Sequence, residues 1–192
     1  MSKIKMEFMD NDIKFFINNE ILTLSLRAGL SRGNSAYNKK NIPDQDKKEL
    51  KNFLRNELTK YSQDYEDKVN EEEHINNIKK LREGTSSYDK ILKGGKLGFG
   101  RVQKLLNLYL KYLWVLNWIP EPPHCPFDRI ILDDIKWAGP NWTDSKFSER
   151  DYITVLEKTN KIANKENSSI AKWELKRWNQ IIKKDYRKGN II

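Results

Sequence analysis

The sequence predicts an all-α fold in a single helical domain spanning residues 1–192. Apolar residues recur at intervals of three and four along most of the chain, and no stretch shows sustained alternation of apolar and polar residues. Residues that favour helix caps precede the apolar stretches. We find no internal repeat and no low-complexity linker, and a chain of this length can bury roughly 70% of its unfolded surface around one core.

The first helix is expected to start at a cap formed by Asp10 or Asn11 and to end at Gly29. The loop that follows is polar, basic and contains glycine, so we expect it on the surface, where its cations and backbone amides can bind an anion. The cations of this loop are Arg32, Lys39 and Lys40.

Two further helices are expected before residue 86. Pro43 precedes a charged helix over about 44–66 with one apolar face, and a shorter helix ends at Gly84. His74 lies among glutamates on the shorter helix, and we expect it at the surface.

The second half of the chain is more apolar. A short helical piece is expected at 88–92, followed by a glycine-rich turn and a long helix to Trp118 that is apolar on nearly every side, so it should lie at the centre of the fold. Three prolines within 122–126 exclude a helix there. A short helix over 127–135 and two further helices, capped by Ser148 and by Ser168 or Ser169, complete the fold.

The composition favours a nucleic-acid partner. The chain has 36 Lys and Arg against 27 Asp and Glu, a net charge of +9, although a solvated basic surface is an alternative. The lone Cys125 excludes an internal disulfide and a cysteine-ligated zinc or iron–sulfur cluster, and we expect neither metal nor cofactor. The most apolar stretch, 112–119, is too short to span a membrane, and no secretory signal is visible. We expect a cytoplasmic monomer, nucleoid-associated if bacterial, with no membrane partner.

The segment 92–105 has the layout of a helical hairpin, which we place at about 86–118. Gly98 and Gly100 flank Phe99 in its turn, and glycines permit a close backbone approach, so that amides at the start of the second helix can bind a phosphate. A helical hairpin in any bundle could use the same glycines for a connection. Nearby cations are expected to contact the DNA backbone. They are Lys93, Lys96, Arg101 and, further along, Arg129.

Downstream of the buried helix, Pro126-Phe127-Asp128 stands at the start of a new helix. With the Gly-Phe-Gly turn, this segment resembles the helix-hairpin-helix DNA glycosylase superfamily over about 91–132, roughly a fifth of the chain. The Gln103-Lys104 pair resembles that of the archaeal 8-oxoguanine glycosylases, although most bifunctional members carry the lysine two residues after the second glycine. The resemblance implies double-stranded DNA with a damaged or modified base as substrate, Asp128 as catalytic carboxylate and Lys104 as nucleophile of an AP lyase activity.

These residue types suit that chemistry. Cleavage of an N-glycosidic bond develops positive charge at C1′, which a carboxylate stabilises, and a neutral lysine amine can attack C1′ to form a Schiff base that permits strand nicking. The target base must leave the stack and enter a pocket with aromatic faces. Four residues near the Asp128 segment are expected to line it: Trp118, His124, Phe127 and Trp142.

Two other functional classes remain open. In a non-catalytic DNA-binding module, Asp128 would only cap a helix and Lys104 would be a solvated lysine. In a protein–protein adaptor, the basic loop 32–40 would be the contact. His124, between prolines, is more often a packing or backbone-bonding residue than an acid or base, and we expect Cys125 to be a small buried hydrophobe.

Overall fold

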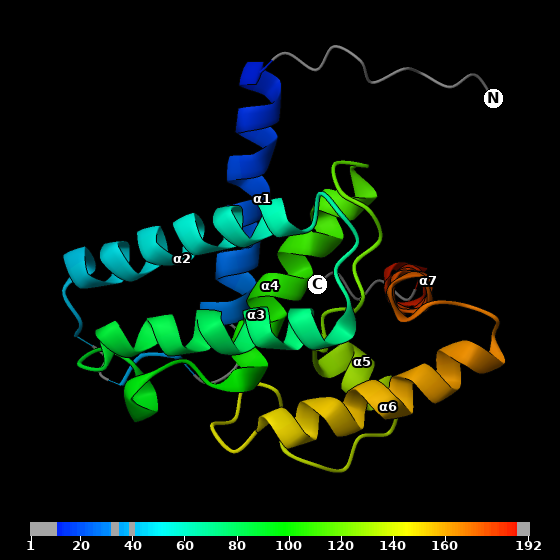
Figure 1. The fold of residues 1–192 in the computed structure, drawn as a ribbon. Coiled ribbons are helices and arrows are strands. Elements are labelled where there is room, and N and C mark those ends of the chain that lie inside the picture. Colours follow the sequence, from blue (N-terminus) through cyan, green and yellow to red (C-terminus); the bar gives the residue numbers. More distant parts are fainter. Residues whose placement is uncertain (1–10, 32–34, 39–40, 188–192) are drawn as a thin grey trace.

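The structure, a computed structural model, describes residues 11–31, 35–38 and 41–187. Over these residues the protein has seven α-helices and two short 3-10 turns, which confirms the predicted all-α fold (Figure 1). The helices are α1 (Asn11–Ser31), α2 (Asp44–Asp64), α3 (Glu71–Gly84), α4 (Phe99–Val115), α5 (Arg129–Asp134), α6 (Glu149–Lys165) and α7 (Ile170–Arg187). None of the described helices combines the length and apolar character needed to cross a membrane.

Helix α4 is the centre of the fold. Helices α1, α2, α3 and α6 all contact it, and Figure 1 shows it surrounded by them. Its leucines at 105, 106 and 110 are fully buried. The apolar character of this stretch on nearly every side therefore predicted its central position correctly.

Local capping patterns account for several helix ends. Ser148 and Asp151 form a reciprocal capping box at the start of α6, as the sequence predicts, and Asn70 with Glu73 forms another at the start of α3. Each box satisfies backbone amides that the first turn of a helix leaves without a partner.

Gly29 does not end the first helix, since α1 continues to Ser31. A β-carbon on Gly29 would lie 2.5 Å from Cγ of Leu105 in α4. The glycine therefore permits the close approach of α1 to α4 rather than acting as a helix terminator.

The short helix expected at 88–92 does not form. Two 3-10 turns, Thr85–Tyr88 and Lys93–Gly95, lead from α3 to α4 instead, and Gly94 and Gly95 have φ values of 73° and 80°. Between them residues 89–91 form a turn, and the extended Leu92 pairs with Tyr37 in an isolated bridge, beside which the amide of Asn38 donates to Ile91 O at 2.9 Å. The turn and the bridge leave no helix at 88–92, so the helix-hairpin-helix motif stays a prediction.

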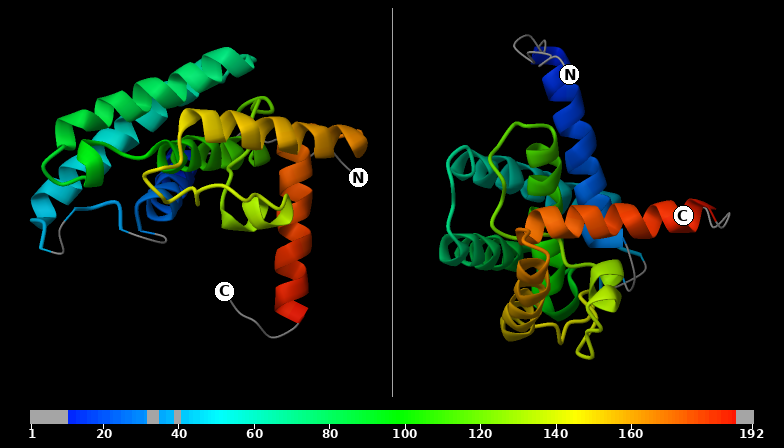
Figure 2. Two further views of the ribbon diagram at one scale, coloured as in Figure 1. Left: turned by 90° about the horizontal axis from the view of Figure 1, so that it is seen from below. Right: turned by 90° about the vertical axis from the view of Figure 1, so that its right-hand side faces the viewer.

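Two helix ends stand away from the bundle. In Figure 2 the N-terminal part of α1 and the C-terminal part of α7 extend beyond the packed helices. Phe15 and Phe16 on this part of α1 are 71% and 63% exposed, in keeping with its few neighbours.

Candidate functional site

Lys104 and Asp128, predicted as a catalytic pair, are in direct contact. Lys104 lies in the second turn of α4, and its Nζ donates to Asp128 Oδ2 at 2.7 Å. Asp128 is the N-cap of α5, and its Oδ1 accepts a hydrogen bond from the amide of Ile131 at 3.2 Å. The side chains are only 5% and 11% exposed. The carboxylate of Asp128 therefore takes part in both the ion pair and the helix cap.

The surroundings of Asp128 set its charge. Burial raises the pKa of its carboxyl, but the charge and hydrogen bond of Lys104 and the amide of Ile131 outweigh this effect, so the pKa lies below its usual value. Asp128 is therefore ionised at neutral pH.

Two amide side chains of α4 hold the segment that leads into Asp128. Gln103 donates from Nε2 to Phe127 O at 2.7 Å and accepts the Phe127 amide at Oε1 at 3.1 Å. Asn107, one turn later, donates to Cys125 O at 2.9 Å and to Oε1 of Gln103 at 3.2 Å. These bonds fix the backbone on either side of Pro126, and with it the position of Asp128.

A second buried ion pair lies on the same side of α4. Nζ of Lys111, seven residues after Lys104, is 2.7 Å from Oε2 of Glu174 in α7, with side chains 12% and 1% exposed. Residues seven apart share one face of a helix. Burial raises the pKa of Glu174 despite the opposing effect of Lys111. Burial also raises the pKa of the nearby Cys125 thiol well above its usual value. Four ionisable side chains therefore lie in one interior region between α4, α5 and α7.

Next to this region is a cluster of two histidines and two tyrosines. The rings of His74 and His124 are 4.5 Å apart in an edge-to-face arrangement. Each Nδ1 bonds a tyrosine hydroxyl, from Tyr65 at 2.6 Å and Tyr152 at 2.7 Å respectively. Burial lowers the pKa of His74 to about 4 and that of His124 well below normal, so both are neutral at pH 7.

The expectation that His74 lies at the surface was wrong. It is fully buried, because it shares a face of α3 with Ile78 and Leu81, and this face packs against α4. The three preceding glutamates occupy the first turn of α3, where negative charge is favourable, so they do not report on the exposure of His74.

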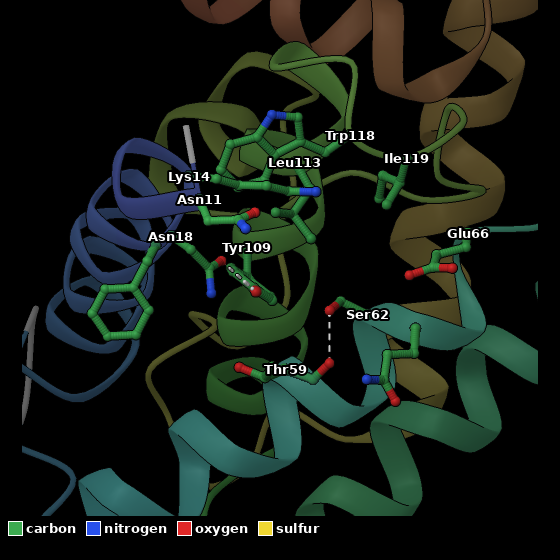
Figure 3. Close-up of a pocket in the computed structure, with 12 residues that line it drawn as sticks. Asn11, Lys14, Asn18, Thr59, Ser62, Glu66, Tyr109, Leu113, Trp118 and Ile119 are labelled. Atoms are coloured by element: carbon green, nitrogen blue, oxygen red, sulfur yellow. Dashed lines mark hydrogen bonds between the residues drawn. The ribbon is translucent and has the colours of Figure 1, made fainter. Parts of the chain in front are cut away.

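The structure does not gather the four predicted base-pocket residues around one opening. His124 and Phe127 are fully buried and both contact the ring of Tyr152. Trp142 is buried elsewhere, beside Arg101. Trp118 is partly buried and lines a pocket of about 310 Å³ that includes neither Lys104 nor Asp128 (Figure 3).

Several predicted DNA contacts do meet at one place. A pocket of about 230 Å³ is lined by Lys93, Lys96, Gly98 and Arg101, together with residues 143–145 of the loop before α6. Lys96 also pairs with Glu83 at 2.7 Å, and Lys93 is exposed. This pocket lies at the N-terminus of α4, where the helix dipole favours an anion.

Other predicted contacts serve the fold or stand apart. Arg101 is buried, and its guanidinium donates to Gly29 O at 2.7 Å near the end of α1. A β-carbon on Gly100 would lie 2.1 Å from the carbonyl oxygen of Trp142, so this glycine already accommodates the chain's own backbone. Arg129 is exposed. Arg32, Lys39 and Lys40 lie outside the described residues.

Comparisons with family models, with curated proteins and with solved structures found no match. The resemblance to DNA glycosylases therefore rests on the residues of the hairpin and of the Asp128 segment alone.

Proposed function

We propose that this protein is a DNA glycosylase with AP lyase activity, which releases a damaged or modified base from double-stranded DNA. The observation that carries the proposal is the 2.7 Å contact between Lys104 and Asp128. The sequence motif predicted both residues, which belong to different elements of the fold. A nucleophile next to a carboxylate is the arrangement that this chemistry requires.

The two side chains divide the work of the reaction. Asp128 is ionised at neutral pH, so it can take a proton from the lysine ammonium or stabilise positive charge at C1′ as the bond to the base breaks. Once neutral, Nζ of Lys104 bonds to C1′ as the bond to the base breaks, and the base departs with the bonding electrons and takes up the proton that Asp128 accepted. Opening of the C1′–O4′ bond then gives the Schiff base, and loss of a proton from C2′ eliminates the 3′ phosphate. Because the pair is nearly buried, DNA binding must displace the residues that cover it.

The pocket at the N-terminus of α4 supplies the DNA contact in this proposal. Lys93 and Lys96 stand at the N-terminus of α4, and a duplex phosphate there would meet both cations and helix amides. The net charge of +9 favours encounter with DNA as a whole. If the protein is bacterial, it would act on genomic DNA in the cytoplasm, in association with the nucleoid.

The test uses a panel of lesion-bearing duplexes with alkaline cleavage to reveal base release. We expect Asp128→Asn, shown by thermal melting to be folded at the assay temperature, to abolish release while duplex affinity stays within about twofold, since asparagine can still cap α5. Asp133→Asn, an exposed carboxylate of the same helix, is the matched control and should retain activity. Loss of release in both variants, or no release by the unaltered protein on any lesion, would contradict the proposal.

Borohydride trapping tests the lyase step separately. A Schiff base with Lys104 becomes a stable protein–DNA adduct on reduction, which Lys104→Gln should not form. Lys146→Gln removes an exposed lysine and should form it normally. Base release without an adduct would leave a glycosylase whose attacking group is water.

A non-catalytic DNA-binding module is the second candidate. The specific observation in its favour is that Asp128 caps α5 while the ion pair is nearly buried, which a structural role explains without chemistry. Tight, salt-sensitive duplex binding with no release on any substrate would favour this candidate.

A further inference from the structure

The pocket of about 310 Å³ lies on the far side of α4 from the ion pairs. It is formed by the exposed end of α1, the end of α2, and the last turns of α4 (Figure 3). On α4 its lining residues are Tyr109 and Leu113, which at 100° per residue lie about 140° and 180° around the helix from Lys104. This pocket is therefore separate from the Lys104–Asp128 site, and its role does not depend on the proposed function.

A rigidly held indole forms one wall of the pocket. Asn117 has a φ of 59°, and the amides of Asn117 and Trp118 bond back to Trp114 O at 2.8 Å and Leu113 O at 2.9 Å. These two bonds form the Schellman type of helix ending, which fixes the backbone of Trp118. Lys14 Nζ lies 5.5 Å from the centre of the indole ring, so the wall carries both an aromatic surface and a cation.

The pocket floor combines apolar side chains with an oriented amide. Leu113 and Ile119 are buried there, and the buried Tyr109 donates from its hydroxyl to Asn18 Oδ1 at 2.8 Å, a bond drawn in Figure 3. Since the oxygen of Asn18 is engaged, its amide nitrogen remains as a donor. Asn11 and Gln63 add two further amides to the lining. Amides offer both donors and acceptors at close spacing.

We propose that this pocket binds a nucleobase. Its volume is at the low end of the range for small-ligand sites, which suits one planar heterocycle. Trp118 offers a surface for stacking, and the amides match the mixed donors and acceptors on the edge of a base. Lys14 and Glu66 give the lining one cation and one carboxylate, which favour a ring with both acceptors and donors over a plain hydrocarbon. The base arrives either as a free nucleoside or as an unstacked base of a nucleic acid strand.

The experiment is a calorimetric titration of the full chain with adenosine, guanosine, cytidine and thymidine, with ribose as the non-aromatic control. A second arm uses a single-stranded oligonucleotide and a duplex with one bulged base. We expect saturable binding in at least one arm and none with ribose. Binding of nucleosides alone identifies a free ligand, and binding of oligonucleotides alone identifies an unstacked base of a strand. Both results support the pocket.

Variants locate the binding. Trp118→Ala should weaken it by roughly 5- to 160-fold, the range expected for loss of one base–aromatic stack, whereas Trp118→Phe should keep most of it. Trp114→Phe changes a partly buried tryptophan one turn away that does not line the pocket, and should leave binding unchanged. Thermal melting confirms that each variant is folded.

Three results would overturn the proposal: no saturable binding in either arm, equal binding by folded Trp118→Ala, or loss of binding in Asp128→Asn that thermal melting shows to be folded. The last result would assign the bound base to the ion-pair site. Base release by the unaltered protein tests the proposed glycosylase activity, and nucleoside or oligonucleotide binding tests the pocket. Failure of one proposal is therefore distinguishable from failure of the other.

Discussion

Replacing Lys104 by methionine is the most direct test of the buried ion pair. Methionine keeps the length and apolar stem of lysine but removes the ammonium that lies 2.7 Å from Asp128. The carboxylate, 11% exposed, then remains charged in the interior without its partner. Breaking one side of a buried pair costs about 3–5 kcal/mol. For a domain of this length that lowers the melting temperature by roughly 6–20 °C.

The pH dependence gives this prediction a distinctive sign. In the unaltered protein the pKa of Asp128 is lowered on folding, so its contribution to stability is present above the unfolded pKa of about 3.9 and is lost as the pH falls through the folded value. In Lys104→Met, burial acts without the opposing lysine and raises the pKa of Asp128. Protonation of Asp128 in acid then removes the unpaired charge from the variant. The difference in unfolding free energy between the two proteins should therefore shrink as the pH falls from about 7 to 5.

Urea unfolding followed by circular dichroism at both pH values measures this difference directly. Comparing the two proteins at each pH removes the contribution of the buried histidines, which both contain. Lys146→Met changes an exposed lysine and should alter stability by less than about 0.5 kcal/mol. If Lys104→Met costs less than about 1 kcal/mol, the pair behaves as a solvated surface pair and the argument from burial fails.

Three further predictions concern the hairpin glycines, the histidine cluster and the charge. Gly100→Ala should lower the melting temperature markedly, because its β-carbon would meet the Trp142 carbonyl, whereas at Gly98 the nearest atom is 3.7 Å away and the same change should be nearly neutral. The pKa of His74 is lowered to about 4 on folding, so the free energy of unfolding should fall by up to roughly 3 kcal/mol as the pH drops from about 6.5 to 4. His74→Gln should reduce this loss, and a variant with the same pH dependence as the unaltered protein would contradict the prediction. Duplex affinity measured by fluorescence anisotropy should fall steeply with salt, and salt-insensitive binding would favour a protein partner instead.

The parts of the fold that follow from local chemistry were predictable from sequence. Ser148 and Asp151 are three residues apart at the start of an apolar periodicity, and the cap of α6 needs nothing more. The central position of α4 follows from its apolar character on all sides. Asp128 as a cap follows likewise from its place before α5, since an N-cap carboxylate bonds an amide three residues on.

Features that depend on distant partners were missed. From the sequence, Arg101 was expected to contact a phosphate beside the predicted hairpin. In the structure it donates to Gly29 O, a bond that depends on where α1 ends. Gln103 and Asn107 were visible as two amides four residues apart in an otherwise apolar stretch, which signals a polar contact inside the core. Their partners are backbone atoms 18 to 24 residues away, and only the folded chain identifies them.

The stability of the fold does not explain why two buried ion pairs lie in one interior region. Exchanging a buried ion pair for apolar side chains of similar volume is often neutral or stabilising, because desolvation offsets most of the attraction. Lys104 with Asp128 and Lys111 with Glu174 place two such pairs on one face of α4, each joining it to a different element. Removing any one charge leaves its partner uncompensated, so the two pairs fix the relative positions of α4, α5 and α7. That same rigidity holds an amine against a carboxylate, which links the architecture of this interior to the chemistry proposed for it.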